Sequence, residues 1–270
     1  MKKKLRIAIL GAGNIGTAIA NGLVQSRRYE LSQIILTRRN ANKIARLRES
    51  GFKAQQDNRA AVETSDIILI AVEPQNMNGL LEEIKPYVRK GQLVISVVTG
   101  VEIKDIARRL GDGVPIVRAM PNTAIAIRRS MTCLCVGKSD NGALKTAEAI
   151  FNAVGETEVI DEANMTAATA LAACGVAFFL RAVRAASQGG IEIGFDADKA
   201  LKIAAQTAKG AASLLLENEQ HPEFEIDKVT TPRGVTISGL NQMEHAGFSS
   251  AMITGIVTAW TKASKLYKKK

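Results

Sequence analysis

The stretch that decides the fold lies near the N-terminus and has the sequence Leu5-Arg6-Ile7-Ala8-Ile9-Leu10-Gly11-Ala12-Gly13-Asn14-Ile15-Gly16. Its mostly apolar first half predicts a buried strand, and residues 17–24 after it predict a helix. A G-x-G-x-x-G pattern between a strand and a helix is typical of a turn that binds the pyrophosphate of a dinucleotide. A glycine-rich turn without a ligand is the alternative, and the flanking strand and helix favour dinucleotide binding.

Each glycine of this turn has a predicted task. Gly11 lets the chain turn sharply off the strand, Gly13 leaves room for a pyrophosphate, and Gly16 lets the helix pack closely on the strand. Free N–H groups at the start of the helix would face the phosphates. The predicted phosphate-binding residues are Gly11, Ala12, Gly13, Asn14, Ile15 and Gly16.

Two arginines follow the predicted second strand, residues 33–36. An NAD-binding unit carries an acidic residue here that accepts from the adenosine ribose hydroxyls. This chain has Arg38 and Arg39 instead, and a guanidinium gives a forked, charge-assisted match to a 2′-phosphate. Solvated loop arginines are the alternative. The sequence therefore predicts NADP(H) as the preferred cofactor, with NAD(H) as a possible second one.

Strands and helices alternate as far as residue 160. Alternation predicts right-handed crossovers and an α/β Rossmann-type, doubly wound and mainly parallel sheet. Ligands of such sheets lie beyond the carboxyl ends of the strands, which nominates residues 71–74, 97–99 and 120–123 as a rim around the cofactor. The further strands are predicted at 52–54, 66–71, 93–98, 115–119, 131–136 and 156–160, and the further helices at 40–49, 77–84, 103–110 and 140–154.

Residues 161–270 contain no run that predicts a strand. We expect helices over 164–188, from Asp196 or Asp198 to 217, and over 236–246 and 249–265, with a loop at 218–234. Asp161 is the expected cap of the first of these helices, whose many small residues suit a subunit interface. The predicted organisation is an NADP-binding Rossmann domain, residues 1–160, and an all-α dimerisation and substrate domain, residues 161–270.

Composition argues against several classes of protein. The formal net charge is +10, yet three lysines stand at each terminus, and without them 30 basic residues face 26 acidic ones. The three cysteines have no C-x-x-C spacing, which argues against a zinc site. The apolar run 167–180 is shorter than a membrane span, and the N-terminus lacks the pattern of a signal peptide. We expect a cytoplasmic protein that binds no nucleic acid, membrane or metal.

A loop in the second half predicts the substrate chemistry. Thr230, Thr231, Gly234 and Thr236 precede a predicted helix, so that backbone N–H groups and hydroxyls converge at its positive end. This arrangement suits a carboxylate. An ordinary capped start of a helix is the alternative.

This loop is part of the motif VTTPRGVTISGL…MEHAGF, which resembles the signature of pyrroline-5-carboxylate reductases, V-[TS]-S-P-G-G-[TA]-T-I-x-x-L followed by L-E-x-x-G-F. The resemblance extends over the chain, through GAGNIG, AVEPQ, VISVVTGV, RAMPNTA, TALAACGVAFF and GAASLLLENEQHP, in the family's order. It implies NADPH-dependent reduction of the cyclic imine 1-pyrroline-5-carboxylate to L-proline, the last step of proline synthesis. It also implies a homo-oligomer, at least a dimer.

The resemblance also implies roles for single residues. The adenosine end would be bound by Arg38, Arg39 and an asparagine placed like Asn58. The substrate carboxylate would sit in the loop of Thr231, Gly234 and Val235, while the Thr236 hydroxyl hydrogen-bonds the ring nitrogen. Glu162 matches a carboxylate that comes near the substrate across the dimer in relatives. The nicotinamide would lie beside Ala71, Val72, Glu73, Pro74, Val97 and Thr99.

Three departures from the family pattern concern the substrate. Arg233-Gly234 replaces Gly-Gly, Val235 replaces the following Thr or Ala, and the segment from Ala172 to Val176 replaces Ser-Gly-Ser-Gly-Pro. An arginine in the loop would either strengthen anion binding or admit a larger acidic substrate. The alternatives are therefore a related imine or β-hydroxyacid-type oxidoreductase with another substrate, or a nucleotide-binding regulator without catalysis.

Overall fold

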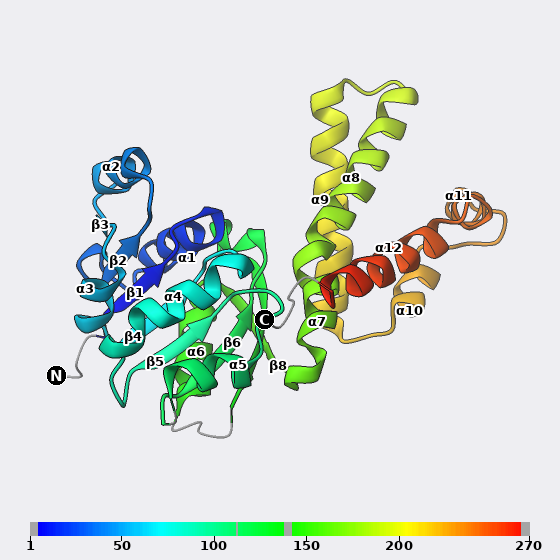
Figure 1. Cartoon of the computed structure of the whole chain (residues 1–270). Helices are drawn as coiled ribbons and strands as arrows, with labels where there is room; N and C mark the ends of the chain where they lie inside the picture. The colour runs from blue at the N-terminus through cyan, green and yellow to red at the C-terminus, as the bar shows by residue number, and fades with distance from the viewer. Residues whose placement is uncertain (1–4, 112, 138–141, 266–270) are drawn as a thin grey trace. The chain divides into compact units, whose positions relative to one another are not determined.

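The computed structural model describes residues 5–111, 113–137 and 142–265. Figure 1 labels the elements along the chain. The chain forms two compact units. One comprises Met1–Cys174 with Ala259–Lys270, and the other comprises Gly175–Thr258. The sequence-based boundary between residues 160 and 161 stays a prediction.

The first unit is built on one sheet with the strand order β3-β2-β1-β4-β5-β6-β7-β8. Neighbouring strands are parallel except β6 and β7, which are antiparallel. The order reverses between β1 and β4, which is the switch point of a doubly wound sheet, so the predicted fold class is confirmed. The strands are β1 Ile7–Leu10, β2 Ile34–Thr37, β3 Lys53–Gln55, β4 Ile67–Ile70, β5 Leu93–Ser96, β6 Ile116–Met120, β7 Ser130–Val136 and β8 Gly155–Val159.

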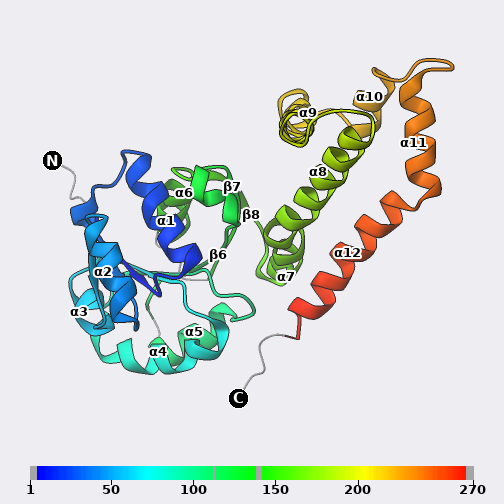
Figure 2. The ribbon, with the colours of Figure 1, turned by 90° about the horizontal axis from the view of Figure 1, so that it is seen from above.

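Helices cover both faces of this sheet because the strands are apolar on both sides. On β1, Ile7 and Ile9 belong to one core cluster and Ala8 and Leu10 to the other. Seen from above, α1 and α6 lie on one side of the sheet, and α4 and α5 on the other (Figure 2). The helices are α1 Asn14–Gln25, α2 Ala41–Glu49, α3 Asn58–Glu63, α4 Met77–Ile84, α5 Ile103–Leu110 and α6 Ala143–Phe151.

Two short helices were not predicted. The six residues of α3 follow Asp57, whose carboxylate accepts from the amides of Arg59 and Ala60. The second, α10 Pro222–Asp227, lies inside the expected loop 218–234, which corrects that prediction. Pro222 presets the backbone of its first turn. Six residues carry too little hydrophobic periodicity for either helix to stand out.

The expected helix 164–188 is more complex than predicted. It begins with a 3-10 turn, Glu162–Asn164, continues through α7 Met165–Ala168 and a π-helical segment, Thr169–Cys174, and ends with α8 Gly175–Glu192. Asp161 stands at the cap position, but its side chain makes no capping hydrogen bond. A π-helical segment leaves backbone carbonyls without their usual helical partners and is frequent at functional sites. It overlaps at residues 172–174 with the segment Ala172 to Val176, which departs from the family pattern.

The Gly175–Thr258 unit is helical. It contains α8, α9 Ala197–Asn218, α10, α11 Val235–His245 and most of α12 Phe248–Ala263. α8 and α9 approach closely at Gly190, where an added Cβ would lie 3.1 Å from the Cβ of Ala200. Large apolar residues are exposed along these helices, among them Phe179, Leu180, Leu216, Ile253 and Val257, and Ile193 is exposed just after α8.

One helical stretch, Glu162–Glu192, is long and apolar enough to cross a membrane by length and composition alone. The sequence prediction considered only the uninterrupted apolar run 167–180. The helical stretch is longer than this run because it continues through scattered polar residues. Only 22% of its most apolar window is buried. Exposed small and apolar residues on a helix equally suit an interface between copies of a chain.

Candidate functional site

The glycine turn joins β1 to α1 and depends on close backbone contacts. Gly11 has φ +97°, and an added Cβ would lie 2.7 Å from the carbonyl oxygen of Ala71. A Cβ on Gly16 would lie 2.5 Å from the carbonyl oxygen of Gly11. These two glycines are therefore required by the fold itself, as the sequence predicts.

Gly13 is different, because an added Cβ would meet nothing within 4 Å. It stands at the cap position of α1, and the first turn of that helix holds no acidic residue. The amides of Asn14, Ile15 and Gly16 have no partners within the helix and lie at its positive end. Open space beside unpaired amides fits a pyrophosphate.

The arginines after β2 lie next to this turn. The backbone amide of Arg38 donates to the carbonyl of Gln55 at 3.1 Å. Its guanidinium Nη1 donates to the carbonyl of Ala12 in the glycine turn. Arg39 is exposed. The structure thus brings the Arg38 guanidinium into contact with the glycine turn.

Asn58 also lies near the turn, at the start of α3. Its Oδ1 accepts from the Thr37 hydroxyl at 2.6 Å, and its Nδ2 lies 3.1 Å from Oε2 of Glu83. The Thr37 carbonyl in turn accepts from the amides of Gly11 and Ala12 at 3.2 and 2.8 Å. Asn58 is therefore part of a network of hydrogen bonds that connects it, through Thr37, to the glycine turn.

The rim residues follow the carboxyl ends of β4 and β5, beside β1. The amide of Ala71 donates to the carbonyl of Leu10 at 2.8 Å, which fixes the segment after β4 against the glycine turn. Glu73 is exposed and its Oε2 accepts from Gln75 at 2.7 Å. Parallel strands end at one edge of a sheet, so the segments after β4 and β5 leave the sheet at the same edge as the turn after β1. The residues of these segments that the sequence predicts beside the nicotinamide are Ala71, Val72, Glu73, Pro74, Val97 and Thr99.

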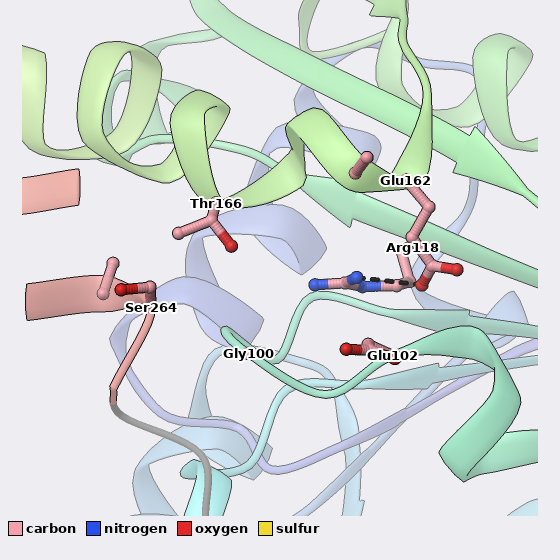
Figure 3. A pocket seen from close by; sticks show the side chains of 8 residues that line it. Gly100, Glu102, Arg118, Glu162, Thr166 and Ser264 are labelled. Atoms are coloured by element: carbon pink, nitrogen blue, oxygen red, sulfur yellow. Dashed lines mark hydrogen bonds and ion pairs between the residues drawn. The ribbon is translucent and has the colours of Figure 1, made fainter. Parts of the chain in front are cut away.

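A cleft of about 660 Å³ opens in the same unit (Figure 3). Sequence reasoning gave no role to Arg118, which lies on β6. Its Nη1 is 2.9 Å from Oε1 of Glu162, and the same oxygen accepts from the amide of Ile103 at 2.7 Å. An arginine within an apolar strand is the signal that was missed, because a buried charge needs a partner. The lining residues are Gly100, Glu102, Arg118, Glu162, Ala163, Thr166, Ala263 and Ser264.

The predicted carboxylate loop belongs to the Gly175–Thr258 unit. The amide of Gly234 donates to the carbonyl of Thr231 at 2.9 Å, and a Cβ on Gly234 would lie 2.5 Å from the Thr231 hydroxyl. α11 starts at Val235, a residue that is 91% exposed. The Thr236 hydroxyl, in the first turn, makes no hydrogen bond with the part of the chain that the structure describes. Hydroxyls and first-turn amides thus cluster in this unit, whereas the predicted cofactor residues and Glu162 belong to the other.

Two of the three cysteines have the chemistry of buried thiols. Cys133 and Cys135 are free and buried on β7. Burial raises the pKa of Cys135 to about 11 and that of Cys133 above its usual value, because the thiolate is poorly solvated there. Both are therefore poor nucleophiles near neutrality. Among the described residues no cluster of three His, Cys, Asp or Glu side chains forms a metal site.

The sheet is of the Rossmann type, the glycine turn has free space at Gly13, and Arg38 contacts this turn. These features together are typical of a dinucleotide-dependent oxidoreductase. Family models agree with this class. Residues 6–100 match the model described as NADP oxidoreductase, coenzyme F420-dependent. Residues 162–266 match the model for pyrroline-5-carboxylate reductase dimerisation.

The chain belongs to the pyrroline-5-carboxylate reductase family. It is 50% identical to pyrroline-5-carboxylate reductase 2 of Dictyostelium discoideum over 98% of this chain and 94% of that protein. It is 53% identical to reductase 1 of the same organism, again over 98% of this chain, but spans only 50% of the length of that relative.

Solved structures of the family share the fold over the whole chain. The pyrroline-5-carboxylate reductase of Coxiella burnetii is 30% identical, with a TM-score of 0.89 over 99% of this chain and 100% of that one. A Plasmodium falciparum pyrroline carboxylate reductase with NADP bound is 24% identical, with a TM-score of 0.88 over 97% of this chain and 98% of that one.

Proposed function

We infer that the chain reduces 1-pyrroline-5-carboxylate to L-proline with NADPH, the last step of proline synthesis. The observation that carries this function is the full-length similarity to named pyrroline-5-carboxylate reductases. The open space at Gly13 and the arginine against the glycine turn support the cofactor.

The cofactor, when bound, supplies a hydride from C4 of its nicotinamide to the imine carbon of the substrate. A protonated imine is already electrophilic, so the protein has mainly to fix distance and angle and to stabilise charge. We propose that the first-turn amides of α1 hold the pyrophosphate while Arg38 and Arg39 hold the 2′-phosphate. Asn58 would support the adenosine end, and the nicotinamide would lie beside Ala71, Val72, Glu73, Pro74, Val97 and Thr99.

The substrate carboxylate would bind the loop that precedes α11. At this positive helix end Thr231 presents its hydroxyl and Val235 its backbone N–H, while Gly234, whose own N–H is bonded to the Thr231 carbonyl, shapes the loop between them. The Thr236 hydroxyl would accept a hydrogen bond from the N–H of the protonated imine. An unassisted hydroxyl is a poor acid near neutrality, so we assign Thr236 an orienting role rather than that of a general acid.

The chain forms homo-oligomers through its helical part. The dimerisation model that matches residues 162–266 supports this assembly, and the exposed apolar side chains of α8, α9 and α12 offer the surface for it. We propose a dimer as the basic unit. We also propose that the enzyme acts in the cytoplasm, without a nucleic-acid or membrane partner.

The function is tested by following NADPH oxidation with 1-pyrroline-5-carboxylate and identifying proline among the products. We expect turnover, and faster turnover with NADPH than with NADH. Turnover only with another imine or a β-hydroxyacid would favour a related oxidoreductase. Cofactor binding without any reductase rate would favour a nucleotide-binding regulator.

Thr236→Ala is expected to lower kcat by about 3- to 10-fold, because one substrate hydrogen bond is worth roughly 0.5–1.5 kcal/mol. NADPH affinity should stay nearly unchanged, since the phosphate-binding residues lie elsewhere in the chain. Thr236→Ser keeps the hydroxyl and serves as the matched control. Steady-state kinetics decide the matter, and equal losses in kcat and NADPH affinity would count against the assignment.

Arg233→Gly is expected to preserve the loop. Arg233 has φ +63°, a left-handed conformation that favours glycine. Glycine at this position relieves about 1–3 kcal/mol of backbone strain in the folded loop. The greater freedom of glycine in the unfolded chain offsets part of this gain in stability. Thermal unfolding should occur at an equal or higher temperature, while KM for the acidic substrate rises severalfold because a cation is lost. A lower unfolding temperature would contradict this interpretation.

A further inference from the structure

Arg118 is a buried cation that the proposed chemistry has not used. Its side chain is 5% exposed, and Glu162 opposite it is 34% exposed. Burying a guanidinium is costly unless it is paired and hydrogen-bonded. Of the guanidinium nitrogens of Arg118, only Nη1 has a hydrogen-bond partner among the described residues, namely Glu162. Figure 3 shows the guanidinium extending into the cleft toward Thr166.

Glu162 does more than neutralise Arg118. Its Oε1 accepts from both Arg118 and the amide of Ile103, which is the first residue of α5. First-turn amides lack a partner within the helix, so this carboxylate also completes the start of α5. One oxygen therefore joins β6, the start of α5 and the turn Glu162–Asn164.

The two segments that Glu162 contacts, the start of α5 and β6, are both close in the sequence to the proposed nicotinamide rim. Ile103 lies four residues after Thr99, which follows β5. Arg118 lies on β6, two residues before Met120, where that strand ends. The spacing between the segments after β5 and β6 is thus set in part by the Arg118–Glu162 pair.

A second contact joins the rim to the same helical stretch independently. Nδ2 of Asn122, just after β6, donates to the carbonyl of Ala172 at 3.2 Å. That carbonyl belongs to the π-helical segment Thr169–Cys174. Oδ1 of Asn122 accepts from the amide of Ala124 at 3.0 Å, which orients the side chain.

We propose that Arg118 and Glu162 are positioning residues for hydride transfer. The pair holds the segments after β5 and β6 at the spacing that the nicotinamide ring needs, and it touches neither substrate nor cofactor. This inference rests on the proposed reductase activity. It differs from the substrate contact that the family resemblance implies for Glu162, and the experiment separates the two roles.

The variants Arg118→Met, Glu162→Gln and their double mutant test the pair in the full-length protein. Each single change is expected to lower kcat about tenfold or more, because small misplacements of reacting atoms are costly. The double mutant should be little worse than either single one, since both remove the same interaction. Arg118→Lys should recover part of kcat. KM for NADPH should change less than threefold, since its phosphate-binding residues are untouched.

A purely structural role would not move the second readout, the isotope effect on kcat with NADPH deuterated at the transferred position of C4. We expect this effect to increase in the single variants, because a misplaced ring makes hydride transfer more rate-limiting. Arg46→Met is the matched control: Arg46 lies on the exposed surface of α2 in the same unit, and its change should leave both readouts as in the wild type.

The outcomes divide clearly. Unchanged kcat and isotope effect in folded Arg118 and Glu162 variants would overturn the positioning role. So would a raised KM for the imine in Glu162→Gln alone with Arg118→Met unaffected, because that pattern indicates a direct substrate contact. A wild-type protein that does not reduce 1-pyrroline-5-carboxylate would instead contradict the proposed function.

Discussion

Replacing both Arg38 and Arg39 by glutamine is expected to lower kcat/KM for NADPH by about 100-fold while that for NADH changes less than about threefold. A hydrogen bond to a charged group contributes roughly 1.5–3 kcal/mol, and two such bonds to the 2′-phosphate account for a loss of this size. NADH has no phosphate at this position. The measurement is steady-state kinetics with both cofactors at saturating imine.

Arg38 needs a separate control because its guanidinium also donates to the Ala12 carbonyl. Arg39→Gln alone removes only an exposed side chain, so it should reduce NADPH selectivity without disturbing the glycine turn. Arg46→Gln, on the exposed surface of α2, should change neither cofactor. Equal losses for NADPH and NADH in the double variant would contradict a phosphate-binding role.

Gly13→Val is expected to weaken both NADPH and NADH by about 100-fold and to leave the fold intact. The new side chain enters space that no atom occupies within 4 Å of an added Cβ. The backbone of Gly13, with φ −79° and ψ −160°, is open to any residue. In that space the side chain would block the approach of the pyrophosphate to the start of α1. Cofactor titration and thermal unfolding are the two measurements.

Gly16→Ala is the matched control for this variant. Its Cβ would lie 2.5 Å from the Gly11 carbonyl oxygen, so it should lower the unfolding temperature, which Gly13→Val should leave unchanged. If Gly13→Val binds NADPH like the wild type, the glycine turn is only a structural feature. A Gly13→Val protein that unfolds as readily as Gly16→Ala would also count against the assignment.

The alternation of strands and helices was predictable because each strand is a short apolar run between turn residues. All eight strands lie within two residues of their predicted bounds. The short helices α3 and α10 were not predicted, since capping by Asp57 and a preset turn at Pro222 outweigh weak periodicity. The π-helical segment contacts a residue that lies far away in the sequence, since Asn122 donates to the carbonyl of Ala172.

The glycine turn was predictable because its geometry is local, and the structure confirms the need for glycine at Gly11 and Gly16. The pair of Arg118 and Glu162 was not predicted, because its members are 44 residues apart in the chain. The roles of the carboxylate loop and of Glu162 in the substrate site rest on the family resemblance and stay predictions.

The transfer of a hydride to the imine carbon is tested most directly with NADPH that carries deuterium at the transferred position of nicotinamide C4. The purified protein is incubated with this cofactor and 1-pyrroline-5-carboxylate, and the mass of the product is measured. The predicted result is L-proline that carries one deuterium on the former imine carbon. Proline without the label, or no proline at all, would contradict the account.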